Sequence, residues 1–498
     1  MLRKVRVALA LFFWVIITLL FLDFTGTVHA WFGWMAKIQF LPAVLALNVG
    51  VVLGLVVMTL LLGRVYCSVI CPLGVMQDFF AWLGRLGGKK RRNKYSYSPA
   101  ISWLRYGVLA LFVVALVAGV SAFVALLAPY SSYGRIVSGF LAPVYAWGNN
   151  QIAGYAESAG SYTFYQTEIY FRSVTAIVAA VTLVVLVVLS WRNGRTYCNT
   201  ICPVGTVLGF LSRYSWLKPV IDTSKCNSCG LCGRRCKAAC INTKEHTIDY
   251  SRCVSCMDCL DNCHQHAISY KHLRHVSEQK AEAPAEGNAD SGRRAFMTGV
   301  GVIAASAAVK AQDKVVDGGL AVIEDKKIPA RKTRIVPPGA VSLSHFSQHC
   351  TACQLCVSVC PTKVLRPSTD MKTFLQPESS YEIGYCRPEC TKCSEVCPAG
   401  AIIRITESDK AATQIGHAVW VKENCVPLTD GVPCGNCARK CPVGAITMVA
   451  YDPSDPDSPK IPVVNDERCI GCGACENLCP SRPFSAIYVE GHEVHREV

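Results

Sequence analysis

The residues best able to do chemistry are the cysteines, which number 29 in a chain of 498 residues. Most belong to a repeated motif in which three cysteines are separated by two residues each and a fourth follows after three more. Three closely spaced thiolates can hold three irons of a cubane cluster from one tight loop, and the fourth thiolate then comes from elsewhere. Six copies of the motif, two of them loose, predict six 4Fe-4S clusters.

Four copies keep the full spacing, and two keep it only for their last three cysteines. The strict copies are Cys226, Cys229, Cys232, Cys236; Cys253, Cys256, Cys259, Cys263; Cys350, Cys353, Cys356, Cys360; and Cys469, Cys472, Cys475, Cys479. The loose copies are Cys386, Cys390, Cys393, Cys397 and Cys425, Cys434, Cys437, Cys441. Cys240 is a ninth thiol in the first cysteine-rich block, where it is either a small buried residue or a replacement for Cys236 as a ligand.

Zinc and disulfide bonds are the alternatives to clusters. Zinc ribbons use paired C-x2-C elements, without a third cysteine at the same spacing or the trailing C-x3-C-P. Disulfides would require export, and cysteines this dense and regular do not favour them. The spacing therefore favours iron–sulfur clusters over both.

A second kind of motif lies among the apolar segments. Residues 63–74 (GRVYCSVICPLG) and 194–205 (GRTYCNTICPVG) agree at eight of twelve positions. Each holds two cysteines at i and i+4, which a continuing helix places on one face. These cysteines are Cys67 and Cys71 in the first copy and Cys198 and Cys202 in the second. They are candidates for one further metal centre or a thiol redox pair, and otherwise are buried packing residues.

Two further groups of charged and polar residues can be interpreted either as functional or as structural. Arg64 and Arg195 precede the paired cysteines and would either offset a cluster's negative charge or anchor the helices at the membrane surface. Asp23, His29 and Lys37 follow the first apolar run. A quinol site needs a proton acceptor near the bilayer surface, which histidine can supply; the alternative is that these are solvated loop residues.

The helices that would position these residues are predicted from four apolar runs, at 5–22, 41–62, 104–127 and 173–189. Each reaches or approaches the roughly 20 residues that a helix needs to cross a bilayer. Arginine and lysine gather before the first run, between the second and third, and after the fourth. The positive-inside rule then places the N-terminus and residues 222–272 in the cytoplasm.

Composition and charge limit the classes of protein to which the chain can belong. Hydrophobic residues make up 51% of the chain and charged residues only 17%, which excludes general disorder. Residues 1–311 carry a surplus of 17 positive charges, whereas residues 312–498 carry a surplus of two negative ones. The positive charge lies beside the apolar runs, which favours membrane topology over nucleic-acid binding.

We therefore expect a multi-domain membrane protein. It would combine a four-helix transmembrane bundle of two parallel hairpin repeats, an α+β two-cluster ferredoxin domain and a four-cluster ferredoxin-type domain. The expected boundaries are 1–215 for the membrane domain, 222–272 for the two-cluster domain, 273–292 for a linker, 293–311 for an export signal or fifth span, 312–340 for a second linker and 341–498 for the four-cluster domain.

The cysteine-rich blocks resemble known iron–sulfur proteins. Residues 222–272 are similar to the bacterial two-cluster ferredoxins, whose crossed ligation implies Cys226, Cys229, Cys232 with Cys263, and Cys253, Cys256, Cys259 with Cys236. The four motifs of 341–498 resemble the four-cluster subunits of respiratory enzymes, which nest their motifs. That likeness implies Cys350, Cys353, Cys356 with Cys479; Cys469, Cys472, Cys475 with Cys360; Cys386, Cys390, Cys393 with Cys441; and Cys425, Cys434, Cys437 with Cys397.

The whole chain resembles a NapH-type membrane quinol dehydrogenase fused to a NapG-type four-cluster ferredoxin. In that family Arg293, Arg294 and Phe296 would correspond to a twin-arginine export signal, which implies that residues 341–498 are periplasmic and the protein is a multi-pass protein of the bacterial inner membrane. The likeness implies oxidation of membrane quinol and delivery of electrons to a periplasmic reductase or cytochrome c-type acceptor. It implies no nucleic-acid partner.

Two other functions remain open at this point. A ferredoxin-driven quinone reductase would run the same chain of clusters in the opposite direction. A maturation factor would use its clusters to reduce a metal ion or to sense redox state. The residues alone do not decide among the three.

Overall fold

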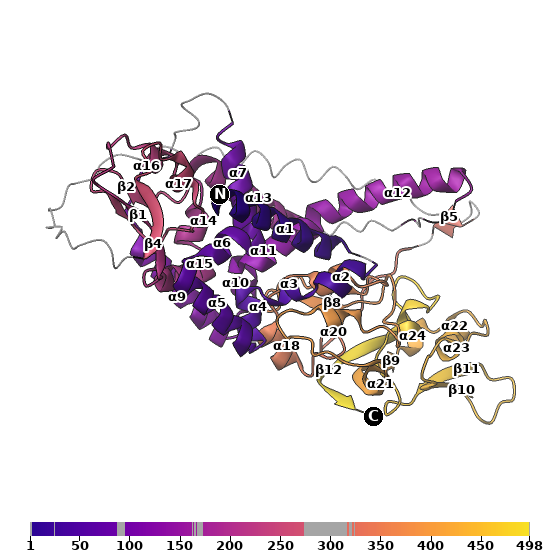
Figure 1. Cartoon of the computed structure of the whole chain (residues 1–498). Coiled ribbons are helices and arrows are strands. Elements are labelled where there is room, and N and C mark those ends of the chain that lie inside the picture. The colour runs from indigo at the N-terminus through magenta and orange to yellow at the C-terminus, as the bar shows by residue number, and fades with distance from the viewer. Residues whose placement is uncertain are drawn as a thin grey trace, which may run out of the picture.

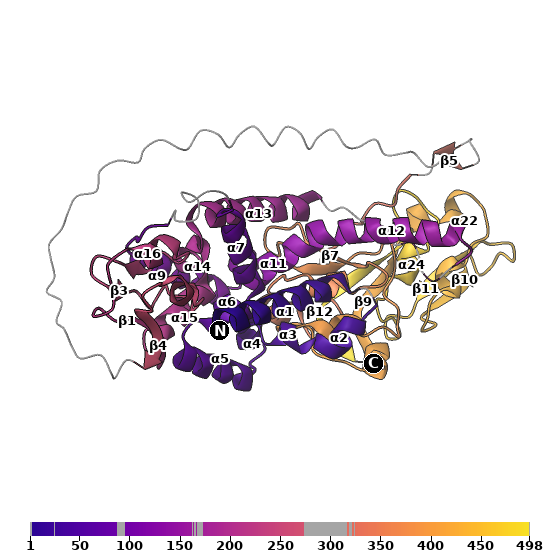
Figure 2. The same cartoon turned by 45° about the horizontal axis from the view of Figure 1, so that its top comes forward.

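The computed structural model describes residues 2–23, 25–86, 95–161, 173–272 and 324–497, with short pieces at 163, 166, 316–317 and 321–322. Figures 1 and 2 both show a helical part in the middle, with the first cysteine-rich block at one end and the last at the other. The expected export signal at Arg293, Arg294 and Phe296 lies outside the described residues.

The helical part consists of long apolar helices joined by short ones. Its elements are α1 (Leu2–Leu22), α2 (Thr27–Phe32), α3 (Trp34–Lys37), α4 (Phe40–Leu45), α5 (Val49–Leu62), α6 (Val65–Val69), α7 (Pro72–Leu83), α9 (Ser102–Val117), α10 (Ser121–Leu127), α11 (Pro129–Ile136), the π-helix η1 (Val137–Leu141), α12 (Ala142–Ser158), α13 (Ser173–Asn193), α14 (Thr196–Thr200) and α15 (Pro203–Ser212).

Two helices in the described residues are long and apolar enough to cross a membrane, Leu2–Leu22 and Val174–Asn193. The other two apolar runs are broken. Leu47, with a φ of 51°, and the Asn48 side chain, which accepts a hydrogen bond from the Val51 N–H, separate α4 from α5. Gly119, with a φ of 71°, separates α9 from α10. A bundle of four spans therefore stays a prediction.

Large apolar side chains are exposed along α1, α5, α9 and α13. Examples are Phe12, Leu53, Val114 and Val181, which are between 47% and 63% exposed. Soluble monomers rarely leave contiguous apolar surface of this extent uncovered. The helices thus keep one apolar side free while their other sides pack together.

The first cysteine-rich block is a small α+β unit. Its elements are β1 (Leu217–Ile221), α16 (Leu231–Arg235), β2 (Ile241–Asn242), β3 (Thr247–Ile248), α17 (Asp258–Asn262) and β4 (Ile268–His272). Strands β1 and β4 pair antiparallel from Leu217–His272 to Ile221–Ile268, and β2 pairs with β3. The β1–β4 pair closes the unit, because it joins the segment before the first cysteine motif to the segment after the second.

The last block is built mostly of loops around short elements. These are α18 (Leu343–His349), α19 (Leu355–Ser358), β7 (Leu365–Pro367), β8 (Pro377–Ser379), α20 (Lys392–Val396), α21 (Glu407–Ala412), β9 (Thr413–Trp420), the 3-10 helix η4 (Lys422–Asn424), α22 (Val426–Thr429), α23 (Asn436–Arg439), β10 (Ile446–Ala450), β11 (Lys460–Val464), α24 (Ala474–Asn477) and β12 (Ile487–Glu497). Strands β9 and β12 form the longest antiparallel pair. Before this block, β5 (Val316–Asp317) pairs with β6 (Ala321–Val322).

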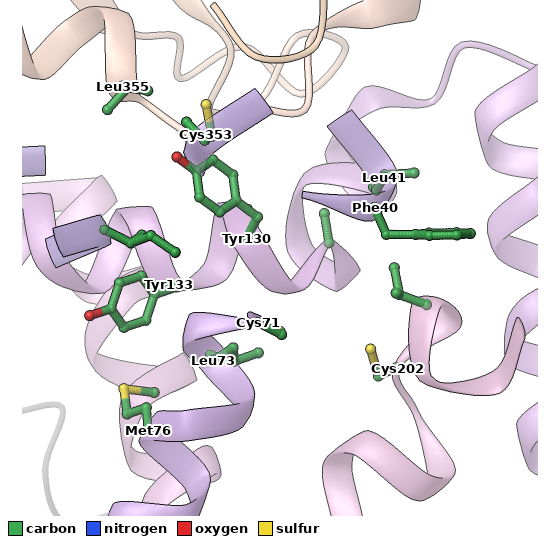
Figure 3. Close-up of a cluster of buried hydrophobic side chains, with 14 of the residues drawn as sticks. Phe40, Leu41, Cys71, Leu73, Met76, Tyr130, Tyr133, Cys202, Cys353 and Leu355 are labelled. Atoms are coloured by element: carbon green, nitrogen blue, oxygen red, sulfur yellow. The ribbon is translucent and has the colours of Figure 1, made fainter. Parts of the chain in front are cut away.

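One continuous core joins the helical part to both blocks. It contains Cys240 and Val254 from the first block, Tyr66 and Leu208 from the helical part, and Phe346 from the last block. In Figure 3 the Tyr130 ring lies between Cys353 of the last block and Leu73 and Cys71 of the helical part. The two cysteine-rich blocks are therefore packed on opposite ends of the same helical core.

Candidate iron–sulfur centres

The first block gathers its cysteines into two groups, each with three from one motif and one from the other. Cys226, Cys229, Cys232 and Cys263 line a cavity of about 350 Å³. Cys236, Cys253, Cys256 and Cys259 line a second, smaller cavity. This is the arrangement that crossed ligation requires.

Cys240 lines the second of these cavities as well. Its Sγ lies 3.6 Å from the Sγ of Cys236, and its side chain is 2% exposed. The structure thus places a fifth thiol at a site for four. Both interpretations of Cys240, as a buried residue and as an alternative ligand, remain compatible with this position.

The last block departs from the nested grouping. Cys479 lines a cavity with Cys425, Cys434 and Cys437, and Cys441 lines another with Cys469, Cys472 and Cys475. Cys397 lies beside Cys350, Cys353 and Cys356, since it raises the pKa of all three in addition to the larger effect of burial. Cys360 similarly raises the pKa of Cys386 and Cys393.

The predicted nested pairing is therefore wrong, because each motif exchanges its fourth cysteine with the neighbouring motif in the sequence. The first two motifs of the block form one crossed unit, and the last two form another. Closing a short loop costs less entropy than closing a long one. Pairing in sequence order therefore loses less chain entropy than nested pairing. The two units meet where the Cys386 N–H donates to the Cys472 carbonyl at 2.9 Å.

None of the cysteine groups is arranged for a single ion. Among the residues that the structure describes, no three His, Cys, Asp or Glu side chains come together closely enough to hold one metal. A zinc site would need four ligands at about 2.3 Å from one ion, whereas a cubane holds its thiolates further apart. Burial raises the pKa of Cys256, Cys353 and Cys472 to about 12, so iron binding must displace their protons.

The four cysteines of the helical part are buried in the common core. Cys67 lies in α6 and Cys198 in α14, while Cys71 and Cys202 stand directly before α7 and α15. Each is at most 5% exposed. The two repeats thus bring their cysteines into the same interior, as Figure 3 shows for Cys71 and Cys202.

Asp23 and His29 form a pair at the end of α1 nearest the last block. His29 Nδ1 lies 3.1 Å from Asp23 Oδ2; the Asp23 side chain is buried, and that of His29 is 9% exposed. His29 Nε2 is buried and has no hydrogen-bond partner among the described residues. Lys37 is exposed at the end of α3 and shares no hydrogen bond or ion pair with them in the described part of the chain. The structure therefore joins two of these three candidates.

Comparisons with known proteins agree with this geometry. Two models of a 4Fe-4S dicluster domain match residues 349–402 and 432–482, respectively, and a model of a 4Fe-4S binding domain matches residues 44–94 and 175–223. The ferredoxin-type protein NapG of Escherichia coli is 33% identical over 177 residues, which cover 32% of this chain and 75% of NapG. The chain belongs to the 4Fe-4S ferredoxin-type protein family.

Other members of the 4Fe-4S ferredoxin-type family are similar too. The methylamine utilization ferredoxin-type protein MauM of Methylophilus methylotrophus is 30% identical over 171 residues, covering 32% of this chain and 72% of MauM. The ferredoxin-type protein NapF of Escherichia coli is 29% identical, covering 32% of this chain and 87% of NapF. No solved structure matches the chain. Within this family, iron–sulfur electron transfer is the activity that the matching domains support.

This member of the 4Fe-4S ferredoxin-type family carries lysine where the ferredoxin motif usually has proline. Lys237 is 3% exposed, and its Nζ lies 2.8 Å from Asp78 and 3.3 Å from Asp258. Asp78 also pairs with Arg6 of α1 at 3.0 Å and with Arg195 at 2.6 Å. Burial alone would raise the pKa of Asp78, but these cations hold it far below its usual range.

This ion network docks the first block on the helical part, and the cysteine spacing does not predict it. The only indication in the sequence was the lysine itself, directly after Cys236 in place of the usual proline. One of its partners lies on α7, far away along the chain, and the other on α17, in the second cysteine motif of the block, so spacing alone could not reveal them. The network adds a polar contact to the apolar core that the first block shares with the helices.

Proposed function

We propose that this protein oxidises quinol in the bacterial inner membrane and passes the electrons through 4Fe-4S clusters to an acceptor outside that membrane. The acceptor would be a periplasmic terminal reductase or a cytochrome c-type protein. The observation that carries the proposal is the packing of two cysteine-rich blocks on opposite ends of helices whose free sides are apolar. That arrangement suits clusters on both sides of a lipid layer.

Six clusters would occupy the six cysteine groups. In the first block they are held by Cys226, Cys229, Cys232 with Cys263, and by Cys253, Cys256, Cys259 with Cys236. In the last block they are held by Cys350, Cys353, Cys356 with Cys397; Cys386, Cys390, Cys393 with Cys360; Cys425, Cys434, Cys437 with Cys479; and Cys469, Cys472, Cys475 with Cys441. The clusters supply one-electron redox chemistry, and the chain sets their spacing and surroundings.

The Asp23–His29 pair is the proposed proton acceptor for quinol. It lies where α1 meets α20, since Glu395 and Lys392 of α20 both act on the His29 ring. Burial lowers the pKa of His29 against the opposing effect of Asp23, so the ring is neutral near pH 7 and can accept a proton. Hydrogen bonds from His29, Thr25 and Gly26 outweigh burial and hold the pKa of Asp23 below its usual value.

The balance of the reaction follows from these positions. Quinol gives up two protons and two electrons to become quinone. The protons leave one at a time through His29, whose Nε2 has no other hydrogen-bond partner in the described residues. Clusters held by the cysteine groups nearest α20 would accept the electrons one at a time. Asp23 holds the imidazole ring through its Nδ1 and stabilises the protonated form between transfers.

The test is reduction of the protein by quinol. Full-length protein is purified without oxygen, oxidised, and mixed with a short-chain ubiquinol or menaquinol while cluster absorbance and electron paramagnetic resonance are followed. We expect quinol to reduce the clusters. The initial rate should rise with pH until His29 is deprotonated, because only the neutral ring can accept a proton.

His29→Gln should slow reduction by quinol by about 10²-fold or more and flatten its pH profile, since it removes the proton acceptor. Lys37→Gln is the matched control, because Lys37 ends the next short helix, α3, and is exposed. Reduction by dithionite should be unchanged in both variants. Clusters that dithionite reduces and quinol does not would contradict the proposal.

A second candidate is the same chain of clusters running in the opposite direction, from a soluble ferredoxin to quinone. The exposure of Cys229 favours it, because this cluster site opens to solvent in a cavity of about 350 Å³. A soluble donor could approach the cluster there. Redox titration distinguishes the directions, since a ferredoxin-fed chain requires the first block to have lower potentials than quinone.

A further inference from the structure

The two cysteine repeats of the helical part are interlocked, each arginine reaching into the other repeat. Arg195 Nη1 donates to the Cys67 carbonyl at 2.6 Å, and Arg64 Nη2 donates to the Cys198 carbonyl at 3.3 Å. The glycines at the ends of the repeats make room for this exchange. A Cβ on Gly74 would lie 2.8 Å from Arg195 Nη1, and one on Gly205 would lie 2.9 Å from Arg64 Nη2.

Part of the buried positive charge between the repeats has no carboxylate partner in the described residues. Arg64 and Arg195 are both 0% exposed. Arg64 has no carboxylate partner among the described residues, and its Nη2 lies 3.8 Å from the Cys67 Sγ. Arg195 is paired with Asp78, but its buried Nη2 has no hydrogen-bond partner in the described part of the chain. A buried cation without an anion is costly, so this interior favours a negatively charged occupant.

Two helix N-termini point to the same occupant. Cys71 stands directly before the 12-residue helix α7, and Cys202 directly before the 10-residue helix α15. The Gly205 N–H donates to the Cys202 Sγ at 3.4 Å. Free N–H groups and the helix dipole stabilise negative charge at such positions, which suits thiolate ligands better than neutral packing thiols.

We infer that Cys67, Cys71, Cys198 and Cys202 together hold a seventh iron–sulfur cluster, with two thiolates from each repeat. Arg64 and Arg195 balance its negative charge. Two thiolates from each repeat give four in all, which is the number of cysteine ligands that a 4Fe-4S core takes. Neither repeat has enough cysteines to hold such a cluster alone, so the site exists only when both are folded together.

The position of this cluster connects the two cysteine-rich blocks. On one side Arg64 Nη1 donates to the Ser251 carbonyl at 3.1 Å, two residues before Cys253. On the other side Tyr197, next to Cys198, donates to the Leu127 carbonyl at 3.3 Å, and the helix that follows Leu127 packs on Cys353. The cluster would take one electron from a reduced cluster in one block and pass it to an oxidised cluster in the other.

This inference rests on the electron-transfer part of the proposed function and does not require quinol as the donor. Its first test is the iron and acid-labile sulfide content of the full-length protein, purified without oxygen. Seven clusters predict about 28 irons per chain, whereas six predict about 24. This count is independent of the quinol experiment, so the two proposals can fail separately.

Cys71→Ser/Cys202→Ser removes one thiolate from each repeat and should remove about four irons and one paramagnetic signal. Val204→Thr is the control, because Val204 is 4% exposed in α15 and carries no thiol; it should keep the wild-type count. About 24 irons in the wild type, unchanged in the double variant, would overturn the inference. If the double variant does not fold, the wild-type count decides alone.

The arginines provide a readout that a purely structural role would not move. Arg64→Gln should lower the reduction potential of the seventh cluster, because it removes positive charge beside the ligand Cys67. Arg64→Lys should restore most of the potential. An unchanged potential in Arg64→Gln, with all seven clusters present, would overturn the assignment of Arg64 as a counter-charge.

Discussion

The fifth thiol in the first block shows how much a single residue can decide at a cluster site. Cys236 and Cys240 are four residues apart, and both sulfurs border the cavity that Cys253, Cys256 and Cys259 line. Both thiols are buried, and their sulfurs are 3.6 Å apart. A small rearrangement of the loop between them would exchange one for the other as the fourth ligand.

We therefore expect Cys236→Ser to keep its cluster, with Cys240 taking over as the ligand. Cys236→Ser/Cys240→Ser should lose about four irons, since three thiolates and two hydroxyls bind a cubane poorly. Iron content and the paramagnetic signal of the first block measure the difference. Cys240→Ser alone is the control and should keep full iron. Loss of the cluster in Cys236→Ser would show that Cys240 serves only to fill space.

Much of the site could be predicted from residue spacing, and the exceptions have physical reasons. Within the first block the two motifs lie close in sequence, so the partner of Cys263 followed from the resemblance to ferredoxins. In the last block four motifs can pair in several ways, and only the fold shows that Cys479 joins Cys425 rather than Cys350. The pairing of Asp23 with His29 depended on how α2 turns back on α1, which spacing does not encode.

At the scale of elements, the buried ion network is the contact that a single substitution would disrupt most. Asp78 on α7 is shared by Arg6 on α1, Arg195 beside α14 and Lys237 of the first block. The prolines usual in ferredoxins only turn the chain, whereas Lys237 also fixes the block to the helices. Removal of the shared carboxylate would leave three cations facing one another in a buried site.

Asp78→Asn should therefore destabilise the docked first block by roughly 3–5 kcal/mol. The measurement is the urea concentration at which the absorbance of the clusters is half lost. Asp261→Asn is the matched control, because Asp261 binds Arg3 at 3.3 Å but is 35% exposed, so it should cost less than about 1 kcal/mol. Equal midpoints for the two variants would mean that the apolar core alone holds the block in place.

At the scale of the whole molecule, the length of α1 sets the separation of the two cysteine-rich blocks. Arg3 near its start pairs with Asp258 of the first block at 2.9 Å, and Phe21 near its end lies in the core beside the Cys353 loop. A helix of 21 residues is about 30 Å long, which is close to the thickness of the hydrocarbon layer. The two blocks are thus held about one bilayer apart.

If α1 spans the membrane, the two blocks are exposed on opposite sides. A protease site inserted in the exposed loop at 452–457 should then be cut in intact spheroplasts. A site inserted at 244–245, which is exposed in the first block, should be cut only after lysis. Cutting of both sites only after lysis would place both blocks in the cytoplasm and remove the periplasmic acceptor from the proposal.

The exchange of arginines between the repeats also sets an order on how the protein can be made. While the ribosome has produced only the first repeat, Arg64 has neither the Asn199 side chain nor the Cys198 carbonyl to bind. The first repeat must wait, incomplete, until residue 205 has emerged. A gene divided between the repeats would therefore yield two unfinished halves, whereas a gene divided between residues 273 and 323 would leave the interlocked repeats whole.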